Sequence, residues 1–400
     1  MRNATNIRGM ARWCLASAAG VLLAAATTAA QADTVKVGVV GPFSGPFARW
    51  GTQFQQAIDV YQKQHGKSVN GHTIEIIYRD SGGPDPVRSK QITQQLITRD
   101  RVNILGGYVF TPNVVAVGDL VTEAKIPLVM FNTPTAAIIR KMPYAVRVSH
   151  TLPEVAEPIA TWALQNGVKR VVTAVSDYTP GFDSEAAFIA KFKEGGGEVL
   201  ESIRIPLATT DFSPFFERVL QQKPDALYIF GPGGPPTVAM VNTWASRLKP
   251  AGIKLLCTSE TMQIDLPQIG KAALGVVSSF HYTETVDNPL NVALKKDLVE
   301  MFGPNTVPDL ASVAAYDGME LIYRAVAKFG PKLTAEQAMG LWKGMKWDSP
   351  RGPMEIDPKD GDMIQNVYLR RVEERDGKLV NINIHTFPMV RDPWKQKHPQ

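Results

Sequence analysis

Cysteine is scarce in this chain of 400 residues, which contains only Cys14 and Cys257. Cys14 lies in an amino-terminal segment that we expect to be removed, and it follows Ala-Arg-Trp rather than the small residues that precede a lipidated cysteine. We therefore expect the mature protein to carry no lipid. One remaining cysteine excludes an intramolecular disulfide bond, so the fold must be stabilised by the burial of apolar side chains.

The chain also lacks an apolar run long enough for a transmembrane helix, which needs roughly 20 residues. The best candidate, at 15–26, follows three arginines and ends before Ala30-Gln31-Ala32. Small residues at the two positions that a signal peptidase recognises are typical of a secretory leader. The pattern predicts a cleavable signal peptide over residues 1–32 and export of a chain that begins at Asp33.

A large excess of one charge is missing as well. The formal net charge is +5, but three of the positive charges are the arginines of residues 1–32. The rest of the chain is therefore close to neutral. Such a balance does not predict binding to nucleic acid, because that requires an extended positive surface.

The sequence lacks the residue patterns of metal sites, cofactor sites and hydrolases. Its six histidines are scattered, with no pair at the helical spacing that places two imidazoles on one metal. Ser44 lies between Gly41 and Gly45, but not in a Gly-x-Ser-x-Gly elbow. The third glycine position of a dinucleotide fingerprint at 231–236 holds Pro236, which has no amide hydrogen for a pyrophosphate. We expect no metal, no cofactor and no enzymatic activity.

Short runs of β-branched residues alternate with amphipathic stretches, a pattern typical of parallel sheets covered by helices. After Pro153 the alternation begins a second time. The expected strands are 35–40, 73–78, 102–105 and 127–130 in the first set, and 170–175, 198–205, 226–230, 253–256 and 275–282 in the second. The expected helices include 51–65, 85–100, 112–124, 289–302 and 310–329, and the final strands 365–372 and 378–384 are expected to pair antiparallel.

The length of the chain favours two lobes, because chains above roughly 250–300 residues usually divide into domains. The sequence between the two sets has no linker rich in proline and serine, which favours several chain crossings at a hinge. We expect an N-terminal lobe of 33–150 with 283–330 and a C-terminal lobe of 151–282 with 331–400.

The segment from Val37 to Gly51, VGVVGPFSGPFARWG, resembles the opening of type I periplasmic binding proteins of the branched-chain amino acid class. The likeness extends from about Val35 to Asn381 through further segments in the order and spacing of that family. These segments are RDSGGPDP at 79–86, VSDYTPG at 175–181, AYDGM at 315–319, PRGP at 350–353 and QNVY at 365–368.

The resemblance implies an α/β fold of two Rossmann-like lobes with central, mostly parallel sheets, joined by three hinge crossovers and closing on a ligand. It also implies a periplasmic receptor that delivers its ligand to an inner-membrane ABC permease pair with a cytoplasmic ATPase. The cleavage site and the missing anchoring segment predict that the mature protein is a monomer. A sensor of amides or amino acids on the same fold is an alternative. A secreted hydrolase is another, although no set of residues supports it.

Ligand contacts carried over from the family fall, in the first lobe, on Trp50, Phe110, Thr111, Asn132 and Thr133. The last four lie between a strand and a helix, where amino-terminal amides and the two threonine hydroxyls would hold a carboxylate. Thr111 could instead serve only as a helix cap. Trp50 could pack beside a turn rather than face the ligand.

In the second lobe, the matching positions are Tyr178, Gly231, Pro232 and Glu260. The resemblance implies that an acid in the place of Glu260 meets the ammonium group of an amino acid ligand. A charge at the amino terminus of a helix is the alternative for this residue. His281 is a further candidate, with a buried, hydrogen-bonded histidine as the alternative.

The first-lobe loop, YVFTP at 108–112, differs from the loop of amino acid receptors, which is rich in small hydroxyl side chains. The usual disulfide bond of that loop is missing too. Asp177-Tyr178 and SPRGP at 349–353 resemble receptors of soil bacteria that often take aromatic carboxylates. We therefore favour an aromatic or other apolar carboxylate as the ligand over a branched-chain amino acid.

Overall fold

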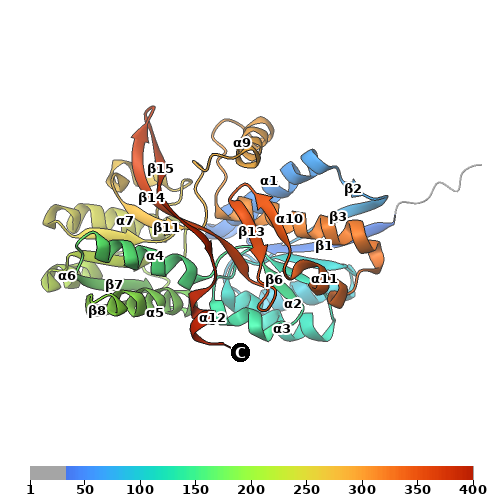
Figure 1. Cartoon of the computed structure of the whole chain (residues 1–400), viewed down its shortest axis with the longest axis horizontal. Coiled ribbons are helices and arrows are strands. Elements are labelled where there is room, and N and C mark those ends of the chain that lie inside the picture. Colours follow the sequence, from blue (N-terminus) through green and yellow to red (C-terminus); the bar gives the residue numbers. More distant parts are fainter. Residues whose placement is uncertain (1–32, 400) are drawn as a thin grey trace, which may run out of the picture.

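The computed structural model describes residues 33–399, which form an α/β fold around two mostly parallel sheets (Figure 1). The expected signal peptide lies outside the described residues. Each sheet, together with the helices that cover it, makes one lobe, and the chain runs between the two lobes near the middle of the molecule. No helix within residues 33–399 is both long enough and apolar enough to cross a membrane.

The first sheet has six strands in the order β2-β3-β1-β4-β5-β6, parallel except for the pair β2 and β3. Its bounds are β1 (Thr34–Gly41), β2 (Ser68–Val69), β3 (His72–Asp80), β4 (Ile104–Gly107), β5 (Leu128–Met130) and β6 (Ala145–Arg147). Val37 and Val39 face the core beneath α1 (Ala48–His65) and α10 (Leu310–Phe329), whereas Val40 faces the core beneath α2 (Pro86–Thr98) and α3 (Thr111–Glu123). Burial on both faces explains the continuous apolar runs of these strands.

The second sheet has nine strands, of which β11, β10, β9, β7 and β8 form a parallel block. These five are β7 (Arg170–Ser176), β8 (Glu198–Ile205), β9 (Ala226–Phe230), β10 (Lys254–Cys257) and β11 (Val277–Phe280). One face packs against α4 (Leu152–Gln165) and α5 (Thr179–Glu194), and the other against α6 (Ser213–Gln222) and α7 (Pro235–Arg247). This lobe is therefore also a sheet between two layers of helices.

Four antiparallel strands extend the second sheet toward the first lobe: β12 (Lys346–Ser349), β13 (Gly352–Ile356), β14 (Met363–Arg375) and β15 (Lys378–Val390). Strand β14 pairs with β13 near its beginning and with β11 further along. Trp347 and Met354 of β12 and β13 join the core beneath α10. The long strand β14 thus forms one of three connections between the lobes, beside those after β6 and after β11.

The remaining helices include two that lie close to the connections between the lobes. Helix α11 (Ala335–Trp342) contacts α10 and β6 of the first lobe, and α12 (Pro393–Lys397) contacts α4 and the 3-10 helix η2 (Ala136–Lys141). The division of the chain at residue 330 stays a prediction. The other helices are α8 (Leu266–Ile269), α9 (Pro289–Phe302), η1 (Gly45–Phe47), η3 (Lys249–Ala251), η4 (Gly270–Ala273) and η5 (Gly330–Lys332).

Candidate functional site

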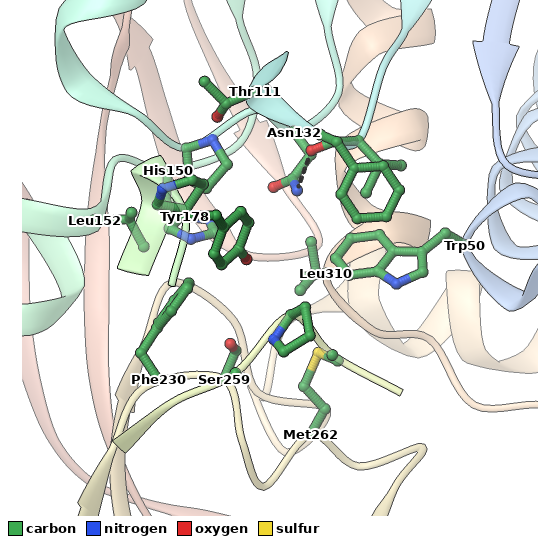
Figure 2. A pocket seen from close by; sticks show the side chains of 17 residues that line it. Trp50, Thr111, Asn132, His150, Leu152, Tyr178, Phe230, Ser259, Met262 and Leu310 are labelled. Carbon is green, nitrogen blue, oxygen red and sulfur yellow. Dashed lines mark hydrogen bonds between the residues drawn. The ribbon is translucent and has the colours of Figure 1, made fainter. Parts of the chain in front are cut away.

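A cavity lies between the lobes at the carboxyl ends of the strands, where loops of both sheets meet (Figure 2). Its lining is Trp50, Val109, Phe110, Thr111, Asn132, Pro134, His150, Leu152, Tyr178, Pro180, Phe230, Gly231, Pro232, Gly233, Ser259, Met262 and Leu310. The lining includes the residues expected at 50, 110, 111, 132, 178, 231 and 232. It does not include Thr133, Glu260 or His281.

Two aromatic residues of the first lobe lie on one side of the cavity. Trp50 belongs to the first turn of α1, and Phe110 precedes α3, where its ring packs edge-on against Phe47 with 4.9 Å between centroids. Trp50 is 6% exposed, and its Nε1 hydrogen has no acceptor among residues 33–399. Buried donors are nearly always paired, so this buried N–H, on a residue that lines the cavity, is a candidate donor to a ligand.

The two threonines of the first lobe are placed differently from each other. Thr111 lines the cavity as the first residue of α3, and its hydroxyl donates to Thr135 Oγ1 at 3.1 Å. Thr133 is buried behind the lining with φ of +62°, and its hydroxyl donates to the carbonyl oxygen of Asn132. Both hydroxyl hydrogens are therefore used within the protein. The expectation that they jointly donate to a carboxylate does not agree with this geometry.

A chain of hydrogen bonds leads from a backbone carbonyl to a histidine that the sequence did not single out. Asn132 Nδ2 donates to the carbonyl of Val109 at 3.0 Å, and Ser149 Oγ donates to Asn132 Oδ1 at 3.2 Å. His150 Nδ1 lies 3.1 Å from the same serine oxygen. Burial, together with the positive charges of Arg147 and Arg351, lowers the pKa of His150 to about 3, so its ring is neutral at physiological pH.

Aromatic rings and a glycine loop form the wall of the second lobe. Tyr178 is the residue before α5, and its ring stacks at 6.3 Å on Phe230 at the end of β9. Burial raises the pKa of Tyr178, which keeps its hydroxyl protonated. In the loop that follows β9, Gly233 has φ of +84°, and its amide donates to Thr237 Oγ1 at 2.9 Å. A left-handed residue of this kind favours glycine, because other residues have a Cβ.

Glu260 lies behind this loop rather than in the cavity. Its carboxylate accepts hydrogen bonds from the amide of Gly231 at 3.0 Å and from the amide of Thr258 at 2.8 Å. The side chain is fully buried, and this burial raises its pKa to about 7. The expected contact with a ligand ammonium stays a prediction, and in this arrangement Glu260 is not among the lining residues. Glu260 instead ties the end of β9 to the end of β10.

His281 is sealed beneath the cavity. Its ring stacks on that of His150, with 4.4 Å between centroids, and the residue is fully buried. Neither ring nitrogen has a hydrogen-bond partner among residues 33–399, so the expected hydrogen-bonded histidine is not found there. Burial and the nearby His150, Arg351 and Arg370 lower its pKa, which leaves a neutral ring. His281 therefore supports His150 by packing.

The cavity attracts negative charge although no charged side chain is among its lining residues. Helices α3, α4 and α5 begin at Thr111, Leu152 and Thr179, next to or within the lining, and α7 begins just after Gly233. The amino end of each helix carries a partial positive charge of roughly half an elementary charge. Four such ends around one cavity favour an anion over a cation.

Two residues of the lining come from segments that carry no sequence signal of a ligand site. Leu310 is the first residue of α10, and Met262 lies in the loop after β10. They reach the cavity because three separate connections bring distant segments together between the lobes. No local motif marks such residues.

Comparisons with known proteins agree with this geometry. The family model of the periplasmic binding proteins matches residues 34–378. The Leu/Ile/Val-binding protein homolog 6 of Brucella melitensis is 43% identical over 371 residues, which cover 92% of this chain and 95% of that protein.

Solved structures of solute binding proteins are also similar to this chain in sequence and in fold. A solute binding protein of an ABC transporter from R. palustris, in complex with 4-hydroxybenzoate, is 44% identical with a TM-score of 0.89, over 91% of this chain and 100% of that one. A solute binding protein from Rhodopseudomonas palustris BisB5, in complex with 3,4-dihydroxybenzoic acid, is 39% identical with a TM-score of 0.87, over 91% and 99%. The expected type I fold and the expected absence of enzymatic function agree with these relatives. The chain belongs to the periplasmic binding protein family, whose members bind solutes without converting them.

Proposed function

We propose that this chain is the solute-binding component of an ABC importer and that its ligand is an aromatic carboxylate, with hydroxybenzoates as the first candidates. One observation carries the proposal: an aromatic cavity without charged side chains between the lobes of a chain 39–44% identical to proteins in complex with hydroxybenzoates. The lobes would close on the ligand, because lining residues come from both of them.

The walls suit a flat aromatic ring. Trp50 lies on one side of the cavity and Tyr178 and Phe230 on the other (Figure 2), and Phe110 of the first lobe is a fourth aromatic residue of the lining. Aromatic rings stack or meet edge to face at centroid distances of roughly 4.5–7 Å, so four rings can cover a fifth one on both faces. The amino ends of the four helices favour an anionic ligand, and the N–H of Trp50 would donate to its carboxylate.

A branched-chain amino acid fits this cavity less well. Its ammonium group needs an acidic partner, but no acid is among the lining residues, and Glu260 holds backbone amides behind the wall. A buried ammonium without a partner costs several kcal/mol or more. The positive field of the helix amino ends would raise that cost further.

The cellular context of the proposal rests on the expected signal peptide and on the family. A mature chain that begins at Asp33 would be released into the periplasm as a monomer. There it would deliver its ligand to an inner-membrane permease pair driven by a cytoplasmic ATPase. Intact-mass measurement on a periplasmic extract tests the cleavage site, and retention of residues 1–32 would contradict it.

Titration calorimetry tests the ligand class. The mature protein would be unfolded and refolded to remove any bound solute, and then titrated with 4-hydroxybenzoate, 3,4-dihydroxybenzoate, benzoate and leucine. We expect saturable binding of the hydroxybenzoates with one site per chain and no heat from leucine. Thermal unfolding gives an independent reading, because ligand at a hundred times its Kd adds about 2.7 kcal/mol to native stability. Binding of leucine without binding of any aromatic acid would contradict the proposal.

A further inference from the structure

Two lining residues, Trp50 and His150, have a ring nitrogen without a partner among residues 33–399, and of these two nitrogens only Nε2 of His150 keeps accessible surface. Its Nδ1 is occupied by Ser149. Its Nε2 makes no hydrogen bond among residues 33–399, and in contrast to both nitrogens of His281 it is not sealed from the cavity. The residue as a whole is 5% exposed, and it is one of the residues that line the cavity (Figure 2).

The hydrogen-bond chain beside His150 determines which nitrogen carries the proton. Asn132 must direct its NH2 group at the carbonyl of Val109, which turns Oδ1 toward Ser149. Ser149 gives its only hydroxyl hydrogen to that Oδ1, so it can only accept from His150. Nδ1 therefore carries the hydrogen, and Nε2 of the neutral ring has a free lone pair.

Burial of the ring, together with positive groups around it, keeps it from gaining a second proton. Arg147 acts on His150 from the end of β6 and Arg351 from the turn between β12 and β13, and neutral His281 is stacked on it. A neutral ring with this tautomer presents an acceptor to the cavity. An acceptor repels a carboxylate oxygen but binds a hydroxyl group.

We propose that Nε2 of His150 accepts a hydrogen bond from the ring hydroxyl of the ligand and so selects hydroxylated aromatic acids over unsubstituted ones. The inference rests on the proposed function and adds an orientation to it. The hydroxyl lies at His150, and the carboxylate lies at the other end of the ring, on the side of Trp50. Selection works because a site built to bond a hydroxyl leaves a buried polar atom unpaired when the hydroxyl is missing.

Calorimetry with three acids on two proteins tests the inference. The acids are 4-hydroxybenzoate, benzoate and 4-methoxybenzoate, which has a ring oxygen but no hydrogen to donate. We expect the wild-type protein to prefer 4-hydroxybenzoate over both others by about tenfold or more. In His150→Phe the ring shape remains and the acceptor is lost, so the preference over benzoate should fall to within about threefold while benzoate affinity changes little.

A second variant and a spectroscopic measurement separate this role from a purely structural one. His150→Gln keeps an acceptor oxygen and should retain part of the preference for the hydroxyl. Proton–nitrogen NMR spectra of histidine-labelled protein should show hydrogen on Nδ1 and none on Nε2. Equal losses for all three acids in His150→Phe, or hydrogen on Nε2, would overturn the inference while leaving the ligand class intact. Failure of the wild-type protein to bind any of the acids would refute the proposed function itself.

Discussion

The two walls of the cavity differ in the kind of group that each presents to a ligand. The first wall, defined by Trp50, Phe110, Thr111, Asn132 and His150, presents polar side-chain atoms that are held by hydrogen bonds or left free. The second wall, defined by Tyr178, Phe230, 231–233 and Ser259, presents two rings and a stretch of backbone. The first wall can therefore distinguish ligand oxygens, whereas the second mainly covers the ligand.

This difference places the sensitive residues of the second wall behind its surface. The glycine loop takes its shape from Glu260 and Thr237, which hold the amides of Gly231 and Gly233 and are both buried. Substitutions behind the second wall should therefore reduce stability, whereas substitutions on the surface of the first wall should change affinity and selectivity.

The largest effect is expected from Glu260→Ala, which removes the buried carboxylate that supports the second wall. The variant leaves the amides of Gly231 and Thr258 without an acceptor, and each unpaired buried donor costs about 1–3 kcal/mol. We expect urea denaturation of the ligand-free protein to show a loss of about 2–5 kcal/mol in the free energy of unfolding. Glu198→Ala, at an exposed position, is the matched control. Equal stability of the two variants would refute the role of Glu260.

The pH dependence of stability is a second test of the contribution that buried Glu260 makes to the fold. The unfolded chain releases the Glu260 proton near pH 4.5, whereas the folded protein keeps it up to about pH 7 because burial raises the pKa. The folded state thus binds more protons in this window, so the contribution of Glu260 to the free energy of unfolding falls as pH rises. In Glu260→Gln this fall is lost. Urea denaturation at pH 5 and at pH 7.5 measures the free energy of unfolding of both proteins. The excess of the wild-type value over that of the variant should be smaller at pH 7.5 than at pH 5, and an equal excess at both pH values would contradict the account.

On the first wall, Trp50→Phe should weaken binding without weakening the protein. The variant keeps an aromatic face but removes the buried Nε1 hydrogen that has no acceptor in the described part of the chain. A hydrogen bond to a charged group contributes about 1.5–3 kcal/mol, so we expect affinity for hydroxybenzoates to fall about tenfold or more. Calorimetry measures the affinity, and thermal unfolding without ligand serves as the control. Unchanged affinity would show that the indole only packs against the ligand.

A smaller effect is expected from an ion pair that joins the two lobes outside the walls of the cavity. Arg49 of the first lobe makes two hydrogen bonds to the buried carboxylate of Asp265 in the second, one of them at 2.9 Å. If the pair forms only when the lobes close, Asp265→Asn lowers the population of the closed form and with it the affinity for every ligand alike. We expect a fall of about threefold to tenfold, with the order of ligand preference unchanged. A change in that order would show that Asp265 acts on the ligand directly.

The sequence predicted most of the fold because the two lobes are built from long, periodic elements. Strands at 198–205 and 226–230 and helices at 289–302 and 310–329 agree with the observed bounds, and β14 and β15 pair antiparallel as expected. Strand β5, of three residues, was predicted because it is a continuous apolar run, whereas the short strands β2, β6, β12 and β13 were not, because polar residues, glycine or proline interrupt them. These strands are held in place by tertiary contacts.

The site was predicted where the family pattern places a residue in the loop or first helical turn that follows a strand. Trp50, Phe110 and Tyr178 are of this kind and line the cavity. Glu260 also follows a strand, but the choice between ligand and backbone amides depends on the direction of its side chain, which sequence does not reveal. His150 lies on a connection between the lobes, and its importance comes from a hydrogen-bond chain that begins at Val109.

A crystal structure of the refolded protein with 4-hydroxybenzoate tests the central claim most directly. The account predicts the ring between the two walls, the hydroxyl within hydrogen-bond distance of His150 Nε2, and the carboxylate beside Trp50 Nε1 with Glu260 still bound to the amide of Gly231. A ligand with its carboxylate on His150, or one bound outside the space between the lobes, would contradict the account.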